Sequence, residues 1–228
     1  AVRRNRHDIL SALGIADFEG ALVNPRQVHG AEVDVLTERN RASFAPREQG
    51  SDAVACTARG VPVLLCYADC VPIVIVAPGG AFCVIHAGWR GALADIPARG
   101  VNVLMETVAS AADGHPDTSG NRICEGLAAR CNAYIGPHIG PCCFETGAEV
   151  IEPFVARFGR EVISENGNLD LGRAVRASLV SAGIDGARIC DAGVCTVCAH
   201  ERFFSYRAED GVTGRIGAIA CKLDGETS

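Results

Sequence analysis

The sequence predicts one domain with a mixed α/β layered fold. Its 228 residues, 48% of them hydrophobic, are enough to bury a full core, and most single domains fall within roughly 50–250 residues. Short runs rich in Val, Ile, Leu and Cys, typical of buried strands, are interleaved with amphipathic segments typical of helices. The order is not the regular βαβ alternation of a doubly wound sheet, and no internal repeat or long linker divides the chain.

The chain begins with a predicted amphipathic helix, Ala1–Gly14, which ends at its glycine. No capping residue precedes this helix, so we expect the domain to be N-terminally incomplete. Next, Ala31–Thr37 alternates apolar and polar residues, as a half-buried strand does. The mostly polar stretch Glu38–Asp52 predicts a loop.

Aliphatic and cysteine-rich runs then predict three strands, the last two joined by a turn at Pro78-Gly79-Gly80. A helix is expected over Gly88–Ser110, although Pro97 and Gly100 should break or bend it. The polar segment Ala111–Asn121 is expected to be a loop. The three strands are Val61–Tyr67, Pro72–Ala77 and Ala81–His86.

The second half of the chain predicts helices and strands in mixed order. Apolar residues at helical spacing favour helices over Glu149–Phe158 and Leu169–Ala182. The stretch Ile135–Cys143 is rich in turn residues. The predicted strands are Cys131–Gly136, Ala187–Ala192, Arg202–Arg207 and Arg215–Lys222.

The composition excludes several classes of protein. A net charge of −6 without a Lys/Arg block argues against a nucleic-acid partner. No apolar run approaches the roughly 20 residues that cross a bilayer, and the basic start is not followed by the apolar segment of a signal peptide. The 12 cysteines are too few for a disulfide scaffold, so most are expected to be buried thiols in a reduced, cytoplasmic protein. The oligomeric state is left open.

Two histidines and a cysteine stand where predicted strands begin or end. His29 precedes a strand, Cys70 lies in the gap between two buried strands, and His86 ends the third. If these strands share an edge of one sheet, the side chains meet there, and such edges often carry binding groups.

Three interpretations of this trio stay open. In the first, His29, Cys70 and His86 hold a zinc ion and leave a fourth tetrahedral position for water or substrate, which gives a nucleophile at neutral pH. In the second, Cys70 is a nucleophile whose pKa His86 lowers, with Asp69 or another group orienting the imidazole. In the third, all three are ordinary core residues.

Other polar residues give weaker signals. Cys195 and Cys198, with His200 nearby, resemble half of a zinc knuckle, but no second CxxC or HxxxH pair completes it. The vicinal Cys142-Cys143 pair is interpreted as a packed turn or a redox-active pair. Arginines with planar guanidinium groups are candidates for binding an anion through two hydrogen bonds. They are Arg90, Arg202, Arg207 and Arg215.

Motifs along nearly the whole chain resemble one family in its own order. The most specific are His86-Ala87-Gly88-Trp89-Arg90-Gly91 and Phe203-Phe204-Ser205-Tyr206-Arg207 followed by Thr213-Gly214-Arg215. Together they are similar to the YfiH-like laccase-domain family, whose members have been labelled polyphenol oxidases, multicopper laccases and purine nucleoside phosphorylases. The further motifs are Gln27-Val28-His29-Gly30, Asp52-Ala53, Ala68-Asp69-Cys70-Val71-Pro72, Ile135-Gly136-Pro137, Ile139-Gly140-Pro141-Cys142-Cys143-Phe144-Glu145 and Cys195-Thr196.

The resemblance implies a single α/β domain over residues 1–228, with mixed β-sheets sandwiched between helices. The N-terminal segment that the family usually carries ahead of this sequence, with a GG(V/I)S stretch, is missing. The resemblance also implies a zinc site on His29, Cys70 and His86. It further implies phosphorolysis of adenosine, inosine and methylthioadenosine and deamination of adenosine, with phosphate and a purine nucleoside as partners.

The hypothesis that follows assigns each remaining residue a role. Arg90, and with it Arg207 and Arg215, would hold phosphate. Asp69 would orient a ligand or relay a proton, or else cap the turn beside Cys70. Trp89 or Phe204 would stack on the purine or belong to the core.

Copper and oxidase chemistry enter only through the family's older labels. A multicopper oxidase needs many imidazoles, often as HxH pairs, and this chain has six histidines and no HxH. A metal-independent cysteine hydrolase or amidase using Cys70 and His86 remains the main rival. A metal-binding or partner-binding scaffold without activity is the third alternative.

Overall fold

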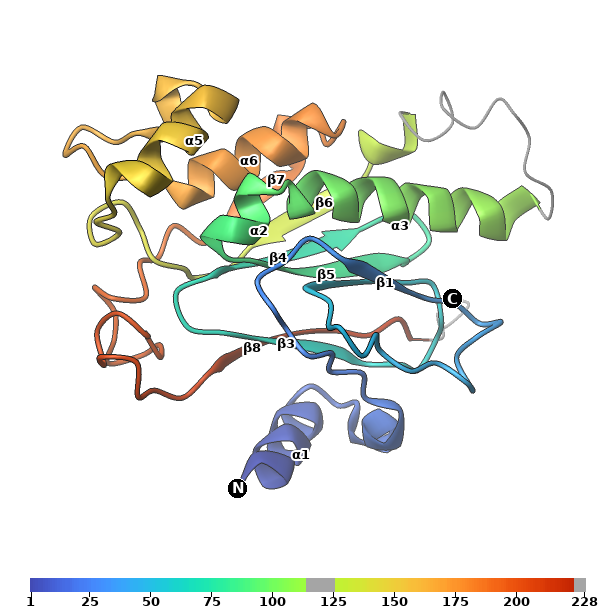
Figure 1. The fold of residues 1–228 in the computed structure, drawn as a ribbon. Helices are drawn as coiled ribbons and strands as arrows, with labels where there is room; N and C mark the ends of the chain where they lie inside the picture. Colours follow the sequence, from blue (N-terminus) through green and yellow to red (C-terminus); the bar gives the residue numbers. More distant parts are fainter. Residues whose placement is uncertain (114–125, 224–228) are drawn as a thin grey trace.

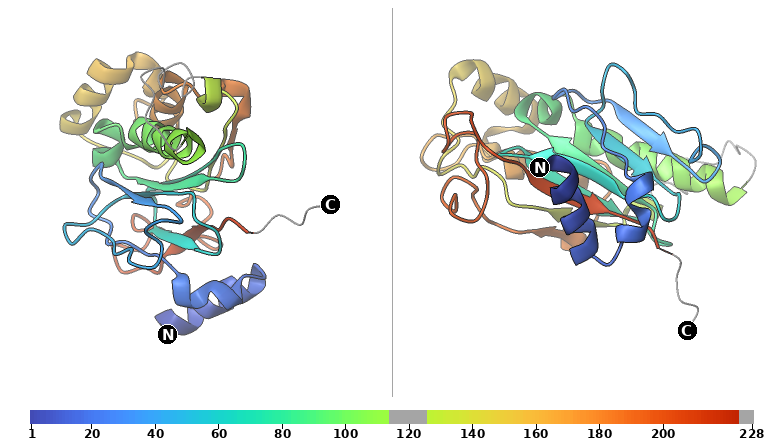
Figure 2. Two further views of the ribbon diagram at one scale, coloured as in Figure 1. Left: turned by 90° about the vertical axis from the view of Figure 1, so that its right-hand side faces the viewer. Right: turned by 90° about the horizontal axis from the view of Figure 1, so that it is seen from below.

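The structure, a computed structural model, describes residues 1–113 and 126–223 and arranges them in layers. Helices cover one face of a six-stranded mixed sheet, and a two-stranded sheet covers its other face (Figure 1). The N-terminal helix lies beyond the small sheet, and the second view of Figure 2 places it across that side of the molecule. The predicted single α/β domain, with mixed sheets between helices, is confirmed.

The six-stranded sheet has the strand order β1-β2-β5-β4-β6-β7. Its outer pairs, β1 with β2 and β6 with β7, are parallel, whereas the inner pairs are antiparallel. In the small sheet, β3 (Val63–Tyr67) pairs antiparallel with β8 (Ile216–Ala220). The strands of the large sheet are β1 (Val33–Leu36), β2 (Ala53–Cys56), β4 (Val71–Val76), β5 (Phe82–Ala87), β6 (Asn132–Ile135) and β7 (Ile189–Asp191).

The helices follow the amphipathic segments of the sequence. The Asp170 carboxylate caps α6 by accepting a hydrogen bond from the backbone N–H of Arg173. None of the helices in the described part of the chain is long and apolar enough to cross a bilayer. The α-helices are α1 (Val2–Ala12), α2 (Trp89–Leu93), α3 (Ile96–Asp113), α5 (Ala148–Phe158) and α6 (Leu171–Ser181), and the 3₁₀ turns are η1 (Ala16–Ala21), η2 (Arg160–Val162) and η3 (Gly186–Arg188).

Strand β5 has core on both faces, which explains its unbroken apolar sequence. Cys83 and Ile85 belong to the core under the helices, whereas Phe82 and Val84 belong to the core between the two sheets. Gly100 lets α3 lie close to the sheet, because a Cβ there would collide with the Cδ1 of Ile85.

The segment Gly88–Ser110, predicted as one helix, forms the two helices α2 and α3. The break between them lies before Pro97 and Gly100, the residues that were expected to break or bend the helix. The chain turns at Asp95, whose φ is +66°, so Pro97 falls in the first turn of α3. A proline there removes no helical hydrogen bond. The prediction of a loop over Ala111–Asn121 is wrong for residues 111–113, because they continue α3. Residues 114–121 lie outside the described residues.

The strand predicted over Arg202–Arg207 is wrong. The segment consists of turns, in which Arg202 and Phe203 both donate backbone hydrogen bonds to the carbonyl of Ala199. The N–H of Arg207 binds the Asp69 carboxylate instead of a neighbouring strand. Strand β2 (Ala53–Cys56) was not predicted, because its four small residues carry little strand signal.

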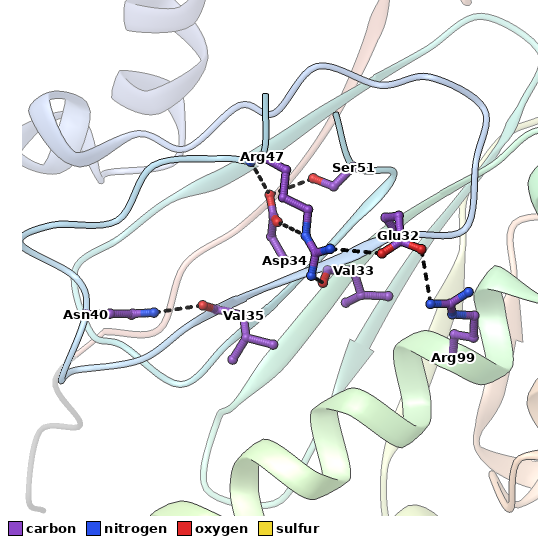
Figure 3. A network of polar contacts seen from close by, with 8 residues as sticks. All are labelled: Glu32, Val33, Asp34, Val35, Asn40, Arg47, Ser51 and Arg99. Carbon is purple, nitrogen blue, oxygen red and sulfur yellow. Dashed lines mark hydrogen bonds and ion pairs between the residues drawn. The ribbon is translucent and has the colours of Figure 1, made fainter. Parts of the chain in front are cut away.

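The loop over 38–52 is fastened to β1 by the polar network of Figure 3. The buried Asp34 carboxylate accepts hydrogen bonds from Arg47 Nε at 2.9 Å and Ser51 Oγ at 2.7 Å. Glu32 bridges Arg47 to Arg99 of α3. These contacts fix the approach of the chain to Asp52, which directly precedes β2.

Candidate metal centre

Strand pairing brings His29, Cys70 and His86 to one edge of the large sheet. Cys70 directly precedes β4, whose Pro72 lies opposite His86 on the antiparallel β5. The start of β2 pairs with the same end of β5, and β1 runs parallel to β2, so the segment before β1 reaches this edge with His29. These strands therefore share one edge, which is the condition under which the sequence analysis brought the three side chains together.

The three side chains form a compact group, here called the His₂Cys centre (His29, Cys70 and His86). One ligand atom from each lies within 4.8 Å of the others, close enough for a single ion to contact all three. The two imidazole rings are nearly perpendicular, with centroids 4.8 Å apart. Two imidazoles and a thiol are a donor set that suits zinc.

Gly88 leaves the space that the His₂Cys centre occupies. A Cβ at this position would lie 2.8 Å from Cδ2 of His29 and 3.2 Å from Sγ of Cys70. His29 itself has a φ of +59°, an uncommon conformation for a residue with a side chain. The backbone is therefore shaped around these ligand atoms, and the residues present fit a metal ion.

Asp52 positions two of the three candidate ligands, and the sequence alone gave it no role. Its carboxylate accepts a 2.7 Å hydrogen bond from Nδ1 of the buried His86. Because a carboxylate only accepts, Nδ1 carries the proton and Nε2 keeps its lone pair for a metal. The carboxylate also accepts backbone hydrogen bonds from Val28, His29 and Gly30, at 3.1, 2.9 and 2.8 Å.

The electrostatics of the centre favour neutral imidazole and protonated thiol when no metal is bound. Burial, with His86 and Arg90 adding to it, lowers the pKa of His29 against the opposing effect of Asp52. Burial and the nearby carboxylates of Asp69 and Asp52 raise the pKa of Cys70 to about 12. A coordinating metal reverses the second effect, since it deprotonates a thiol ligand outright.

The His₂Cys centre opens into a cleft of about 570 Å³. The three arginines expected to hold phosphate, Arg90, Arg207 and Arg215, all line it, together with Phe144 and Tyr206. Trp89 and Phe204, the aromatic residues proposed to stack on a purine, are not among the lining residues.

The three arginines are held differently. Arg90 is exposed, and its guanidinium lies over the Trp89 ring, 4.3 Å from the centroid. Arg207 donates hydrogen bonds to the carbonyls of Cys143 and Glu145, and Arg215 to those of residues 213 and 214. Arg90 is thus held by a ring contact, whereas Arg207 and Arg215 are held by backbone carbonyls.

Asp69 makes hydrogen bonds to three segments that are distant from it in sequence. Its carboxylate accepts hydrogen bonds from Thr196 Oγ1 at 2.6 Å and from the backbone N–H of Arg207 at 2.7 Å. Its carbonyl accepts a hydrogen bond from the N–H of Ile139 at 2.9 Å. The residue has a φ of +82°, an uncommon conformation for a residue with a side chain.

The fold and this centre place the chain in a defined protein family. The family described as multi-copper polyphenol oxidoreductase laccase matches residues 1–222, and the chain belongs to it. The resemblance to YfiH-like proteins noted from the sequence is thereby confirmed.

Curated relatives carry names of purine-nucleoside enzymes. The chain is 36% identical over 198 residues to "Adenosine deaminase RL5" from an unknown prokaryotic organism, covering 82% of this chain and 69% of that protein. It is 34% identical over 205 residues to "Purine nucleoside phosphorylase YlmD" of Geobacillus stearothermophilus, covering 85% and 69%. The YfiH protein of Escherichia coli, also named a purine nucleoside phosphorylase, is 32% identical, covering 85% and 70%.

Solved structures share the fold. The crystal structure of YlmD from Geobacillus stearothermophilus superimposes with a TM-score of 0.76 at 29% identity, covering 98% of this chain and 80% of that one. The structure of the hypothetical protein YfiH from Bacillus licheniformis gives a TM-score of 0.78 at 27% identity, covering 97% and 80%.

Proposed function

We propose that this chain is a zinc-dependent purine nucleoside phosphorylase that also deaminates adenosine. Adenosine, inosine and methylthioadenosine are the proposed nucleoside substrates. The observation that carries the proposal is the convergence of two imidazoles and a thiol on a cleft lined by three arginines. The names of the relatives, which include a purine nucleoside phosphorylase and an adenosine deaminase, support the substrate class.

His29, Cys70 and His86 would hold the zinc ion. When bound, zinc supplies Lewis-acid chemistry that generates or orients a nucleophile at neutral pH. The ligand types also suit copper, but six histidines without an HxH pair do not furnish the set of centres that a multicopper oxidase needs. We therefore propose zinc rather than copper, and nucleoside turnover rather than phenol oxidation.

Phosphorolysis needs an anion site beside the ribose. A phosphate oxygen forms a bond to the anomeric carbon while the bond from that carbon to the base nitrogen breaks, and the electron pair leaves with the base, which takes up a proton. Arg90, Arg207 and Arg215 would hold the phosphate through charge-assisted hydrogen bonds. The held phosphate in turn stabilises the positive charge that develops on the ribose.

Deamination would use the same cleft. Oxygen from water replaces the amino group at C6 of adenine, and ammonia leaves. Phe144 and Tyr206 would offer faces for the purine ring, since both line the cleft and aromatic rings stack favourably.

Asp52 and Asp69 are proposed as positioning residues. Asp52 holds the tautomer and orientation of His86 through the 2.7 Å hydrogen bond. Both Asp69 carboxylate oxygens already accept hydrogen bonds, so Asp69 holds Thr196 and the backbone of Arg207 in place. These contacts favour neither the proton relay nor a cap on the turn beside Cys70, and we propose instead that Asp69 ties two distant segments together.

The rival cysteine hydrolase is less well supported. A metal-independent nucleophile needs a thiolate near neutral pH, which requires a lowered pKa. Burial and two carboxylates raise the pKa of Cys70 to about 12 instead.

The proposal is tested by following adenosine and inosine with inorganic phosphate by liquid chromatography. We expect free base and ribose 1-phosphate, loss of turnover after chelation, and recovery after zinc is restored. His86→Ala should lose turnover together with the zinc ion of the His₂Cys centre. Full activity in metal-free protein would contradict the proposal, and activity that a thiol-alkylating agent destroys while chelation spares it would favour the cysteine hydrolase.

A further inference from the structure

Four cysteines from two distant loops meet beside the cleft. Cys142 and Cys143 follow the turn after β6, whereas Cys195 and Cys198 belong to the segment between β7 and β8. The Sγ atom of Cys198 lies 3.6 Å from that of Cys142 and 3.5 Å from that of Cys143. All four Sγ atoms lie within 4.8 Å of one another. This group is called the tetrathiolate cluster (Cys142, Cys143, Cys195 and Cys198).

The separations in the tetrathiolate cluster match a tetrahedral ion. Zinc–sulfur bonds of about 2.3 Å keep tetrahedral thiolates about 3.8 Å apart. The observed 3.5 and 3.6 Å are close to this spacing and far longer than the roughly 2 Å of a disulfide.

The backbone is also arranged for sulfur ligands. The N–H of Gly140 donates a hydrogen bond to Sγ of Cys195, with the two atoms 3.3 Å apart. Backbone N–H groups of Val197 and Cys198 also hydrogen-bond this sulfur. A Cβ at Gly140 would lie 3.2 Å from Cβ of Cys195 and 3.3 Å from Sγ of Cys142, so glycine makes room for the cluster.

We propose that the tetrathiolate cluster is a second metal site, which binds one zinc ion through four thiolates. It is distinct from the His₂Cys centre and does not depend on the proposed function. Four protein ligands leave no open coordination position, so the role is structural. Binding releases the thiol protons to solvent and requires no oxidant or reductant.

A zinc ion here would fasten two walls of the cleft together. The 140–143 loop leads to Phe144, and the carbonyl of Cys143 accepts a hydrogen bond from Arg207. The 195–198 segment includes Thr196, whose hydroxyl donates to Asp69. Loss of this ion is therefore expected to loosen the phosphate-binding arginines, while the ligands of the His₂Cys centre stay in place.

Metal stoichiometry tests the proposal. Protein dialysed against zinc and then freed of excess metal should contain two zinc ions per chain, one for each group of candidate ligands. The double variant Cys142→Ser/Cys198→Ser should lose one of them and keep the other, and His86→Ala should do the same. Cys190→Ser, a change at an exposed cysteine outside the cluster, is the matched control and should keep both.

Spectroscopy keeps the test independent of how the double variant folds. In the His86→Ala protein, X-ray absorption at the zinc edge should show a shell of sulfur ligands only, and cobalt substitution should give the spectrum of a tetrathiolate. A zinc content that the double variant leaves unchanged would overturn the proposal. So would a disulfide among these cysteines in the freshly purified protein, or iron or copper in place of zinc.

Discussion

The Oδ1 atom of Asp52 lies 2.7 Å from Nδ1 of His86, and both side chains are almost fully buried. The same carboxylate binds the backbone on both sides of His29. One acidic residue thus sets the orientation of one imidazole and the loop that carries the other. The geometry of the His₂Cys centre depends on this carboxylate as much as on the candidate ligands.

Replacement of Asp52 by asparagine is expected to weaken zinc binding by about 10–100-fold, the usual effect of removing a partner that orients a metal ligand. The amide would also present N–H groups to backbone donors. Competition with a fluorescent chelator measures the affinity. Asp34→Asn is the matched control, because Asp34 is also buried but contacts Arg47 and Ser51. Equal losses in the two variants would refute the role given to Asp52.

Acid should destabilise the metal-free protein partly through Asp52. Burial acts to raise the pKa of this carboxyl, but hydrogen bonds from His86 and the backbone of Gly30 and Val28 outweigh it and lower the pKa below 3.8. The associated stability is present above pH 3.8 and lost as the pH falls through the lowered pKa. Urea unfolding at successive pH values should show a shallower acid dependence in Asp52→Asn. Identical slopes would contradict this assignment.

Substitution of Gly88 by alanine is expected to displace His29 and Cys70. The new methyl group would sit 2.8 Å from the imidazole and 3.2 Å from the sulfur, with a backbone φ of −71° that alanine accepts. We expect zinc affinity to fall about tenfold or more, with a cost in stability of about 1–3 kcal/mol. Gly20→Ala, where nothing lies within 4 Å, serves as the control in the same titration. Unchanged affinity in the Gly88 variant would exclude the crowding effect.

Removal of the Arg90 guanidinium should weaken phosphate binding. A charge-assisted hydrogen bond contributes about 1.5–3 kcal/mol, so the KM for phosphate is expected to rise roughly 10–150-fold in Arg90→Ala. Initial rates at varied phosphate, with inosine in excess, give this value. Arg99→Ala should leave it unchanged, since Arg99 lies on α3 and pairs with Glu32. A fall in kcat alone would argue that Arg90 does not hold phosphate.

Thiol reactivity distinguishes a Cys70 that serves as a metal ligand from a Cys70 that serves as a nucleophile. With its pKa raised to about 12, Cys70 in metal-free protein should react slowly with iodoacetamide at neutral pH, and exposed Cys190 should be modified before it. Peptide mass spectrometry of timed samples gives the order. Selective early modification of Cys70 would instead identify it as an activated nucleophile.

Much of the sheet could be predicted because its strands are continuous apolar runs. Strands β4 and β5 are buried on both faces, so their sequences contain almost no polar residues. The small residues of β2 gave too weak a signal. The aromatic-rich segment 202–207 resembled a strand, although its backbone hydrogen bonds are local or go to Asp69. Pattern alone does not show which backbone groups find a partner strand.

The candidate ligands were predictable, but their surroundings were not. His29, Cys70 and His86 each flank a strand, so a shared sheet edge could be inferred. Asp52 precedes the strand that was missed, and its role therefore appears only with the pairing of β2 and β5. The Cys195–Cys198 half-knuckle looked incomplete because the two cysteines that lie beside it are a vicinal pair far away in sequence.

A crystal structure of zinc-loaded protein, with anomalous diffraction recorded on both sides of the zinc absorption edge, tests the account most directly. We expect an anomalous peak within about 2.0–2.3 Å of one nitrogen of His29, the sulfur of Cys70 and Nε2 of His86. No peak among these three atoms, in crystals where zinc is seen elsewhere on the chain, would contradict it.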